Sequence, residues 1–230
     1  MSIVNWKNIF TQSEKFKSSK STKWAFIEGF LNNDFYEKLE KSFPIFDDTW
    51  DVEDSYDKLS YRKYWKMKEN RIISKDRDAR YDESWNEFME YAWSNEFCEK
   101  IVEFSGLKPT NLKNFVFMTL KKNGFQLPHT HNVSDQTLMI FLYLSKGWKQ
   151  GDPGGTYLSD GNDESKILFE PYNLQNSALI VLDGPNAAHG VRQVTKDVER
   201  KAIQLTYEPF SNDKGWFSAS QTVPSELIDL

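Results

Sequence analysis

The sequence predicts an α+β fold in which helices from the N-terminal part pack against an antiparallel sheet from the C-terminal part. Apolar residues recur at helical spacing within residues 24–105, whereas from residue 114 onward short β-rich runs are separated by turn residues. With 230 residues, 39% of them hydrophobic, the chain can bury one sizeable core. Closing the strands into a jelly roll would leave few exposed edges.

Two helical stretches are expected in the first part of the chain. Asn33 can cap a helix over residues 34–42, which has three apolar positions at helical spacing: Phe35, Leu39 and Phe43. A second stretch begins near Asp82, restarts near Asn95 and stops at Gly106. It carries four apolar residues on one face, which should pack against the sheet: Trp85, Phe88, Met89 and Ala92.

Five strands are expected in the second part, where β-branched and aromatic residues are dense. They cover residues 115–120, 137–144, 156–158, 177–182 and 200–207. No internal repeat or linker divides the chain, so we expect a single domain over residues 1–230. It would comprise a mainly helical part (1–113), a strand-rich core (114–210) and a C-terminal tail (211–230).

Composition narrows the range of partners. A net charge of -5 and a pI near 5.4 argue against sequence-independent binding of nucleic acid, which needs a basic surface. Cys98 is the one cysteine, so no intramolecular disulfide can form and a reducing compartment is expected. The first residues lack a secretory signal, and no stretch reaches the ~18 apolar residues of a membrane span. We therefore expect a cytoplasmic protein without nucleic-acid or membrane partners.

The three histidines of the chain all lie in the strand-rich part. His129 and His131 are separated by one residue, so an extended backbone would present both imidazoles to the same point. His189 follows an apolar strand and a turn and opens the next strand, a position suited to the rim of a pocket. Imidazole is the commonest protein metal ligand. These three residues are therefore the candidate metal ligands and catalytic residues.

The order of motifs around the histidines is more specific than their spacing. In chain order they are GFQLPH ending at His129, MIFLYL over residues 139–144, GGTYL over residues 154–158, HGV beginning at His189 and RKA beginning at Arg200. This order resembles the 2-oxoglutarate and Fe(II)-dependent dioxygenase superfamily, especially its prolyl-hydroxylase-like branch, over roughly residues 115–209. The segment WAFIEGFL over residues 24–31 is similar to the usual opening of such enzymes.

The resemblance implies a double-stranded β-helix, a cupin-like jelly roll, as the catalytic core. It further implies Fe(II) as the metal, 2-oxoglutarate as cosubstrate and dioxygen as oxidant. His129 and His189 match the two histidine ligands of the family. Arg200, separated from His189 by ten residues, matches the basic residue that pairs with the far carboxylate of 2-oxoglutarate, with Arg192 as the weaker candidate. Lys201 should point to the opposite face of the same strand.

His131 departs from the family pattern, because it stands where the family has a carboxylate ligand. We favour a site of three histidines, which would carry one more positive charge than the usual set. A second reading is that His131 swings away and leaves an open position, as in the family's halogenases. A third is that Asp135 supplies the carboxylate, although it lies off the strand register.

By this resemblance the chain would be a non-haem Fe(II)/2-oxoglutarate oxygenase, an oxidoreductase that hydroxylates an unactivated C–H bond. The substrate would be a small molecule or a protein side chain. Halogenation or another oxidative outcome at the same centre is one alternative, and a non-catalytic cupin-like metal-binding protein is another. The aromatic and basic residues 56–71 suggest a lid over the metal, with ordinary packing as the competing interpretation.

Overall fold

The computed structural model describes residues 2–67, 73–108, 110–197, 199–211 and 215–216. Its helices are α1 (Trp6–Phe10), α2 (Ser13–Ser18), α3 (Asn33–Lys41), α4 (Glu83–Trp93), α5 (Asn95–Ser105) and the short 3-10 helix η1 (Glu164–Lys166). The strands of the first half are β1 (Trp24–Glu28), β2 (Asp51–Ser55), β3 (Lys58–Tyr64), β4 (Asn111–Leu120) and β5 (Phe125–His129). The later strands are β6 (Leu138–Leu144), β7 (Thr156–Ser159), β8 (Ile167–Phe169), β9 (Gln175–Leu182), β10 (His189–Val191), β11 (Arg200–Glu208), β12 (Phe210–Ser211) and β13 (Gly215–Trp216).

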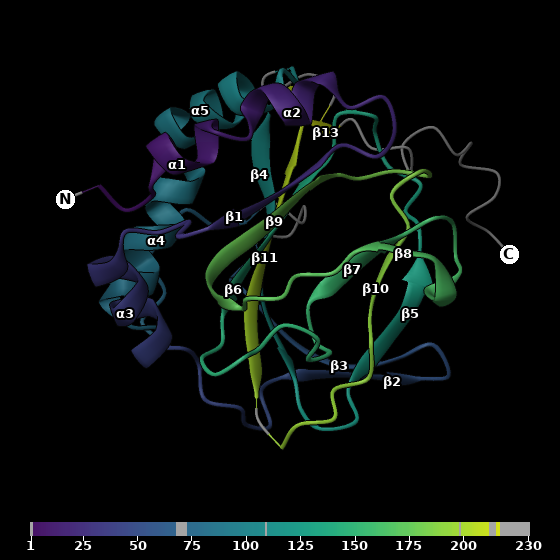
Figure 1. The fold of residues 1–230 in the computed structure, drawn as a ribbon. Coiled ribbons are helices and arrows are strands. Elements are labelled where there is room, and N and C mark those ends of the chain that lie inside the picture. The colour runs from purple at the N-terminus through teal and green to yellow at the C-terminus, as the bar shows by residue number, and fades with distance from the viewer. Residues whose placement is uncertain (1, 68–72, 109, 198, 212–214, 217–230) are drawn as a thin grey trace, which may run out of the picture.

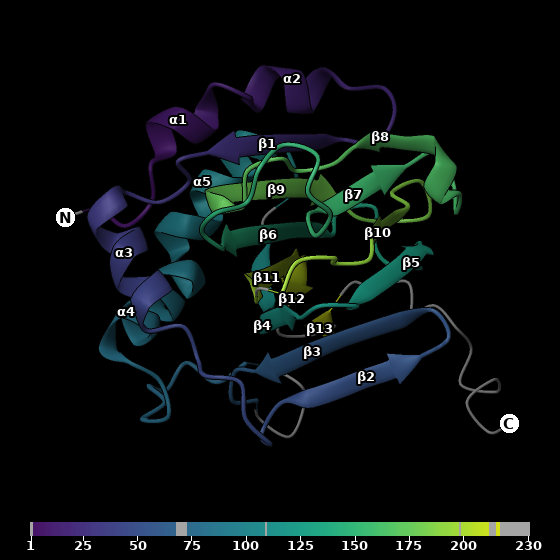
Figure 2. The same ribbon diagram turned by 60° about the horizontal axis from the view of Figure 1, so that its bottom comes forward.

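Strands β1 to β11 form one antiparallel sheet in the order β1-β9-β6-β11-β4-β3-β5-β10-β7-β8, with β2 paired to β3. The sheet curls, so that β5, β10, β7 and β8 lie across an interior from β6, β11 and β4 (Figures 1 and 2). This is the predicted jelly roll. Helices α1, α3, α4 and α5 gather on the opposite side of the sheet (Figure 1), as the α+β prediction requires.

Strand β6 shows why the domain has two cores, because every one of its residues is buried. Alternate side chains point to opposite faces of a strand. One set packs into the core shared with the helices: Leu138, Ile140, Leu142 and Leu144. The other set packs into the interior of the jelly roll, together with residues of β7 and β10: Met139, Phe141 and Tyr143. A strand buried on both faces reads as a continuous apolar run, which is what MIFLYL is.

Most predicted helix boundaries are confirmed. The Ser84 backbone N–H donates to the Asp82 side chain (2.9 Å) at the start of α4, and the Phe97 N–H donates to Ser94 (3.1 Å) at the start of α5. Gly106 ends α5 with a left-handed φ of 71°. The cap predicted at Asn33 is wrong by one residue. Helix α3 begins at Asn33 itself, and the Asn33 carboxamide oxygen instead accepts from the side chain of Asn176 (3.2 Å).

The five predicted strands are present, but the division at residue 114 does not separate helices from strands. Strands β1, β2 and β3 come from before it and pair with the core. The sequences of β2 and β3, DVEDS and KLSYRKY, carry too many charges to show an apolar alternation. A lid was one interpretation of residues 56–71. Within that range, Lys58–Tyr64 form a strand of the sheet. Residues 68–72 lie outside the described residues. Of the predicted tail, residues 211, 215 and 216 are described.

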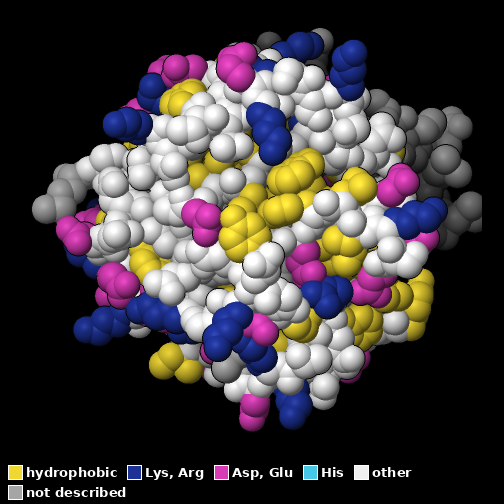
Figure 3. Space-filling model, viewed as in Figure 1, with side chains coloured by type: hydrophobic (Ala, Val, Ile, Leu, Met, Phe, Trp, Pro, Cys, Tyr) yellow, Lys and Arg dark blue, Asp and Glu magenta, His cyan; other side chains and the backbone are white. Residues whose placement is uncertain are grey.

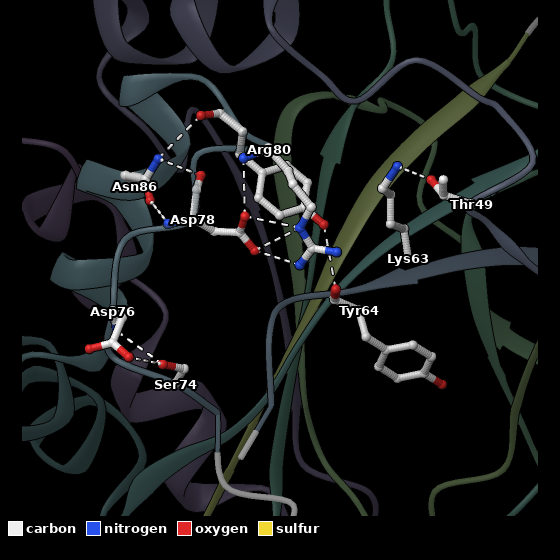
Figure 4. A network of polar contacts seen from close by, with 9 residues as sticks. Thr49, Lys63, Tyr64, Ser74, Asp76, Asp78, Arg80 and Asn86 are labelled. Carbon is white, nitrogen blue, oxygen red and sulfur yellow. Dashed lines mark hydrogen bonds and ion pairs between the residues drawn. The ribbon is translucent and has the colours of Figure 1, made fainter. Parts of the chain in front are cut away.

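A polar network fixes the connection between β3 and α4 (Figure 4). The Asp78 carboxylate accepts from the Arg80 backbone N–H (3.0 Å) and from Arg80 Nε (2.9 Å). The Asn86 carboxamide oxygen accepts from the backbone N–H of Asp78 (2.7 Å). Next to this network Tyr81 stacks on Trp65 with ring centroids 4.7 Å apart. These contacts hold α4 against the sheet and so support the strands that carry the candidate site.

Phe117 should be a key residue for stability, because its fully buried ring meets Trp85 of α4 (centroids 4.8 Å apart) and Tyr81 (4.9 Å). We expect Phe117→Ala to lower the free energy of unfolding by about 3–5 kcal/mol. The measurement is urea denaturation followed by tryptophan fluorescence. Tyr56→Ala is the control, since Tyr56 is 91% exposed and its removal should change stability by less than about 0.5 kcal/mol. Equal effects of the two substitutions would contradict this account of the core.

Candidate metal centre

The pairing of β5 with β10 brings the histidines together. His129 is the last residue of β5 and His189 the first of β10, and the two are direct partners in the antiparallel register. His131 follows two residues after His129, in the segment that leaves β5. The imidazole centroids lie 4.5 Å apart for His129 and His189, 4.9 Å for His129 and His131, and 5.0 Å for His131 and His189. The structure thus gathers the three candidate ligands at one point.

Gly190, the next residue of β10, explains how this short strand fits between its neighbours. Strand β10 pairs with β5 on one side and with β7 on the other. A Cβ atom at Gly190 would lie 2.5 Å from the Tyr157 hydroxyl and 2.6 Å from the Gln126 carbonyl oxygen, closer than van der Waals contact allows. Glycine at this position therefore permits the close approach that places His189 beside His129.

Each histidine has its Nδ1 atom hydrogen-bonded to an oxygen of the protein. The acceptors are the carbonyl of Leu127 for His129 (3.1 Å), the carboxylate of Asp183 for His131 (2.8 Å) and the carbonyl of Ala187 for His189 (2.8 Å). Carbonyl and carboxylate oxygens accept, so Nδ1 carries the proton and Nε2 keeps its lone pair. In agreement, the Gln126 side-chain amide donates to Nε2 of His129 (3.3 Å). All three Nε2 atoms thus keep a lone pair for one metal ion, which would displace the Gln126 amide from His129.

Burial favours the neutral form of His129 and His189. Burial and, after it, the neighbouring His129 lower the pKa of His189 to about 4. Burial is also the main cause that lowers the pKa of His129. Neutral imidazole is the form that binds metals. One nitrogen from each ring lies within 4.8 Å of the other two, and a set of three nitrogen donors suits a divalent transition metal such as iron. The residues present therefore fit a metal ion.

Arg200 is fully buried in the interior of the jelly roll. Its Nε donates to the Gly154 carbonyl (2.9 Å) and its Nη2 to the Thr156 hydroxyl (3.1 Å), while the guanidinium lies 5.2 Å from the Tyr143 ring centroid. Nη1 is buried as well, and no described residue accepts a hydrogen bond from it. A buried cation without a carboxylate partner among the described residues is costly, and a bound anion would offset that cost.

The competing site residues lie elsewhere. Arg192 is occupied by an ion pair with Glu170 (2.7 Å) and is partly exposed. Lys201 points to the helical face, as predicted, where its ammonium lies near Glu40 (3.5 Å) and over the Phe43 ring (5.7 Å). Asp135 is exposed and does not belong to the cluster of possible metal ligands in the described chain. These positions favour Arg200 and the three histidines over the alternatives.

Asp183 is a further residue of this centre, which its sequence position indicates as a turn former and, as the weaker alternative, as a residue that orients a ligating histidine. It comes directly after β9 and before Gly184-Pro185, and such a position is typical of a turn former. The structure instead buries it, with 5% of its surface exposed, against His131. Its place at the end of an apolar strand, six residues before His189, is the only signal in the sequence.

The fold is shared with solved oxygenases at low sequence identity. A prolyl-4-hydroxylase from Pseudomonas putida superposes with a TM-score of 0.59 and 12% identity, covering 88% of this chain and 100% of that one. A prolyl hydroxylase from Trichoplax adhaerens, solved with a peptide fragment of hypoxia-inducible factor, gives a TM-score of 0.56 and 12% identity, covering 88% of each chain. HygX from Streptomyces hygroscopicus, solved with nickel, 2-oxoglutarate and hygromycin B, gives 0.53 and 12%, covering 89% of this chain and 88% of that one.

No protein-family model and no curated protein sequence matches the chain. The structural likeness therefore establishes the double-stranded β-helix fold, as the sequence predicted. The roles of the four site residues remain predictions that depend on the geometry described above.

We expect His129→Ala, His131→Ala and His189→Ala each to weaken Co(II) binding by more than about 100-fold, because the loss of a ligand should exceed the 10- to 100-fold cost of disturbing a ligand's partner. Isothermal titration of each variant with Co(II) measures this. Asp135→Ala is the control and should bind like the parent. His189 is only 3% exposed, so its replacement by alanine leaves a cavity. A cavity there should also lower the melting temperature.

Proposed function

We propose that the protein is an Fe(II)- and 2-oxoglutarate-dependent oxygenase whose metal is held by His129, His131 and His189. The observation that carries this proposal is the combination of three convergent Nε2 atoms with a buried guanidinium that has a free donor in the same jelly roll. The iron and cosubstrate would supply oxidative decarboxylation of 2-oxoglutarate coupled to hydroxylation of an unactivated C–H bond, with succinate and carbon dioxide as products.

The residues of the chain would contribute binding and orientation. Arg200 would pair with the far carboxylate of 2-oxoglutarate through Nη1, while its bonds to Gly154 and Thr156 keep the guanidinium plane fixed. The buried apolar side chains of the jelly-roll interior, which include Leu158 and Val191, would exclude water and so strengthen that ion pair. A metal on the three histidines and the guanidinium of Arg200 would thus hold the two ends of the cosubstrate.

The substrate would enter beside β3, where charged side chains border the centre. In the β3–β4 register Arg62 lies opposite Met118, which belongs to the interior core, so both face inward. The Glu53 carboxylate forms ion pairs with Arg62 (2.8 Å) and with Lys58 (3.0 Å). Burial and then the neighbouring His131 lower the pKa of His129, and the positive charge of Arg62 adds a smaller lowering. We propose a small molecule or a protein side chain as substrate, in line with the antibiotic and the peptide bound by the structural neighbours.

A cytoplasmic location and the lack of nucleic-acid and membrane partners also remain proposals. No helix in the described part of the chain is both long and apolar enough to cross a bilayer. On the face shown in Figure 3, lysine and arginine side chains are interspersed with aspartate and glutamate, and a broad basic surface for phosphates is not seen there. The net charge of -5 agrees with this pattern.

The alternatives predict different products at the same centre. Halogenation requires an open metal position, and the placement of His131 within 5.0 Å of both other imidazoles favours three ligands instead. A non-catalytic metal-binding protein would not require a buried Arg200 whose Nη1 lacks a hydrogen-bond partner among the described residues. Succinate formation that requires Fe(II), 2-oxoglutarate and oxygen together would support the proposed activity. Absence of 2-oxoglutarate binding by the metal-loaded protein would contradict it.

Substitution of Arg200 tests the proposed binding of 2-oxoglutarate most directly. Arg200→Lys keeps the charge but loses the planar fork, and Arg200→Ala loses both, so 2-oxoglutarate affinity should fall in that order, by about 2–5 kcal/mol for the alanine. Anaerobic calorimetry on the metal-loaded proteins measures it, and Co(II) affinity should stay near that of the parent. Arg192→Ala is the matched control and should bind 2-oxoglutarate normally. If Arg192→Ala were the damaging change, the cosubstrate role would move to Arg192.

A further inference from the structure

Asp183 is held rigidly where it meets the candidate metal centre. Its backbone N–H donates to the Thr137 carbonyl (2.8 Å), which ties it to the segment entering β6. Its carboxylate uses both oxygens, because Oδ1 accepts from the Gly184 N–H (2.8 Å) and Oδ2 accepts from His131 Nδ1 (2.8 Å). The side chain is 3% exposed. A carboxylate this well fixed can determine the orientation of the ring to which it is bonded.

The charge of Asp183 is not balanced by a conventional partner. In the described part of the chain, no lysine or arginine lies within ion-pair distance of this carboxylate, and His131 is the basic side chain that does. Burying an isolated carboxylate is costly. A divalent ion on the far nitrogen of His131 would supply the missing positive charge. The environment of Asp183 is thus what a carboxylate–histidine–metal arrangement requires.

We propose that Asp183 is a positioning residue that restores to the centre the negative charge lost when histidine stands in place of the usual carboxylate ligand. The inference rests on the proposed metal site. Asp183 keeps His131 in the tautomer with the proton on Nδ1, aims Nε2 at the metal and increases the basicity of that nitrogen. In this arrangement the carboxylate does not ligate the metal itself but accepts a hydrogen bond from the ligand His131.

The two donors explain why this position needs a carboxylate rather than an amide. An asparagine at 183 has one acceptor oxygen, whereas Gly184 N–H and His131 Nδ1–H both need an acceptor. If the carbonyl stays with Gly184, the NH2 group faces His131 Nδ1 and stabilises the tautomer with the proton on Nε2. That tautomer cannot ligate the metal through Nε2. Asp183→Asn is therefore nearly isosteric but should disturb the site strongly.

The test compares Co(II) affinity of the intact parent protein with that of Asp183→Asn and Asp183→Ala, by calorimetry without 2-oxoglutarate. We expect each variant to bind about 10- to 100-fold more weakly. The matched control is Asp135→Asn, which removes the same charge from an exposed position nearby and should bind like the parent. In a His131→Ala background, Asp183→Asn should cause no further loss, since the effect of Asp183 passes through His131.

A second measurement does not depend on the folding of any variant. In the parent loaded with diamagnetic Zn(II), long-range 1H–15N correlation spectra should show His131 protonated at Nδ1 and coordinated through Nε2. Coordination through Nδ1, or no coordination, would overturn the role of Asp183, as would unchanged Co(II) affinity in Asp183→Asn. A parent that binds neither Co(II) nor Zn(II) would instead contradict the proposed metal site itself, so the two failures are distinguishable.

Discussion

The pairing of β10 with β5 and β7 is the constraint on which the site depends. This three-residue strand sets His189 opposite His129 on one side and runs beside Thr156 of β7 on the other. Thr156 in turn accepts from the buried Arg200. A single short strand therefore connects the histidines to the guanidinium, and Gly190 is the residue that lets it fit. The rest of the jelly roll holds β10 in place.

The charges of the site residues constrain the candidate centre as much as their positions do. Burial keeps His129 and His189 neutral, which gives the metal good ligands but no negative charge. Asp183 brings one negative charge to His131, and Arg200 buries one positive charge beside Thr156. A divalent metal and a dianionic cosubstrate would complement this pattern. Each charged group would then have a counter-charge in the place where it is buried.

The sequence predicted those elements whose residues carry a periodic signal. MIFLYL, HGV and the face of α4 were recognisable because burial on one or both sides leaves an apolar pattern. Strands β2 and β3 were missed because their charged residues border the mouth of the site instead of filling a core. The sequence indicates Asp183 mainly as a turn former, because its contact with His131 joins two loops and the β6–β9 pairing places Asp183. Local sequence contains no information on such a pairing.

A crystal structure of the protein grown with Ni(II) and 2-oxoglutarate would test the central claim most directly. The three-histidine account predicts one anomalous peak at about 2.0–2.2 Å from the Nε2 atoms of His129, His131 and His189, with 2-oxoglutarate reaching Nη1 of Arg200. A metal bound by only two of the histidines, or a cosubstrate carboxylate that does not contact Arg200, would contradict the account.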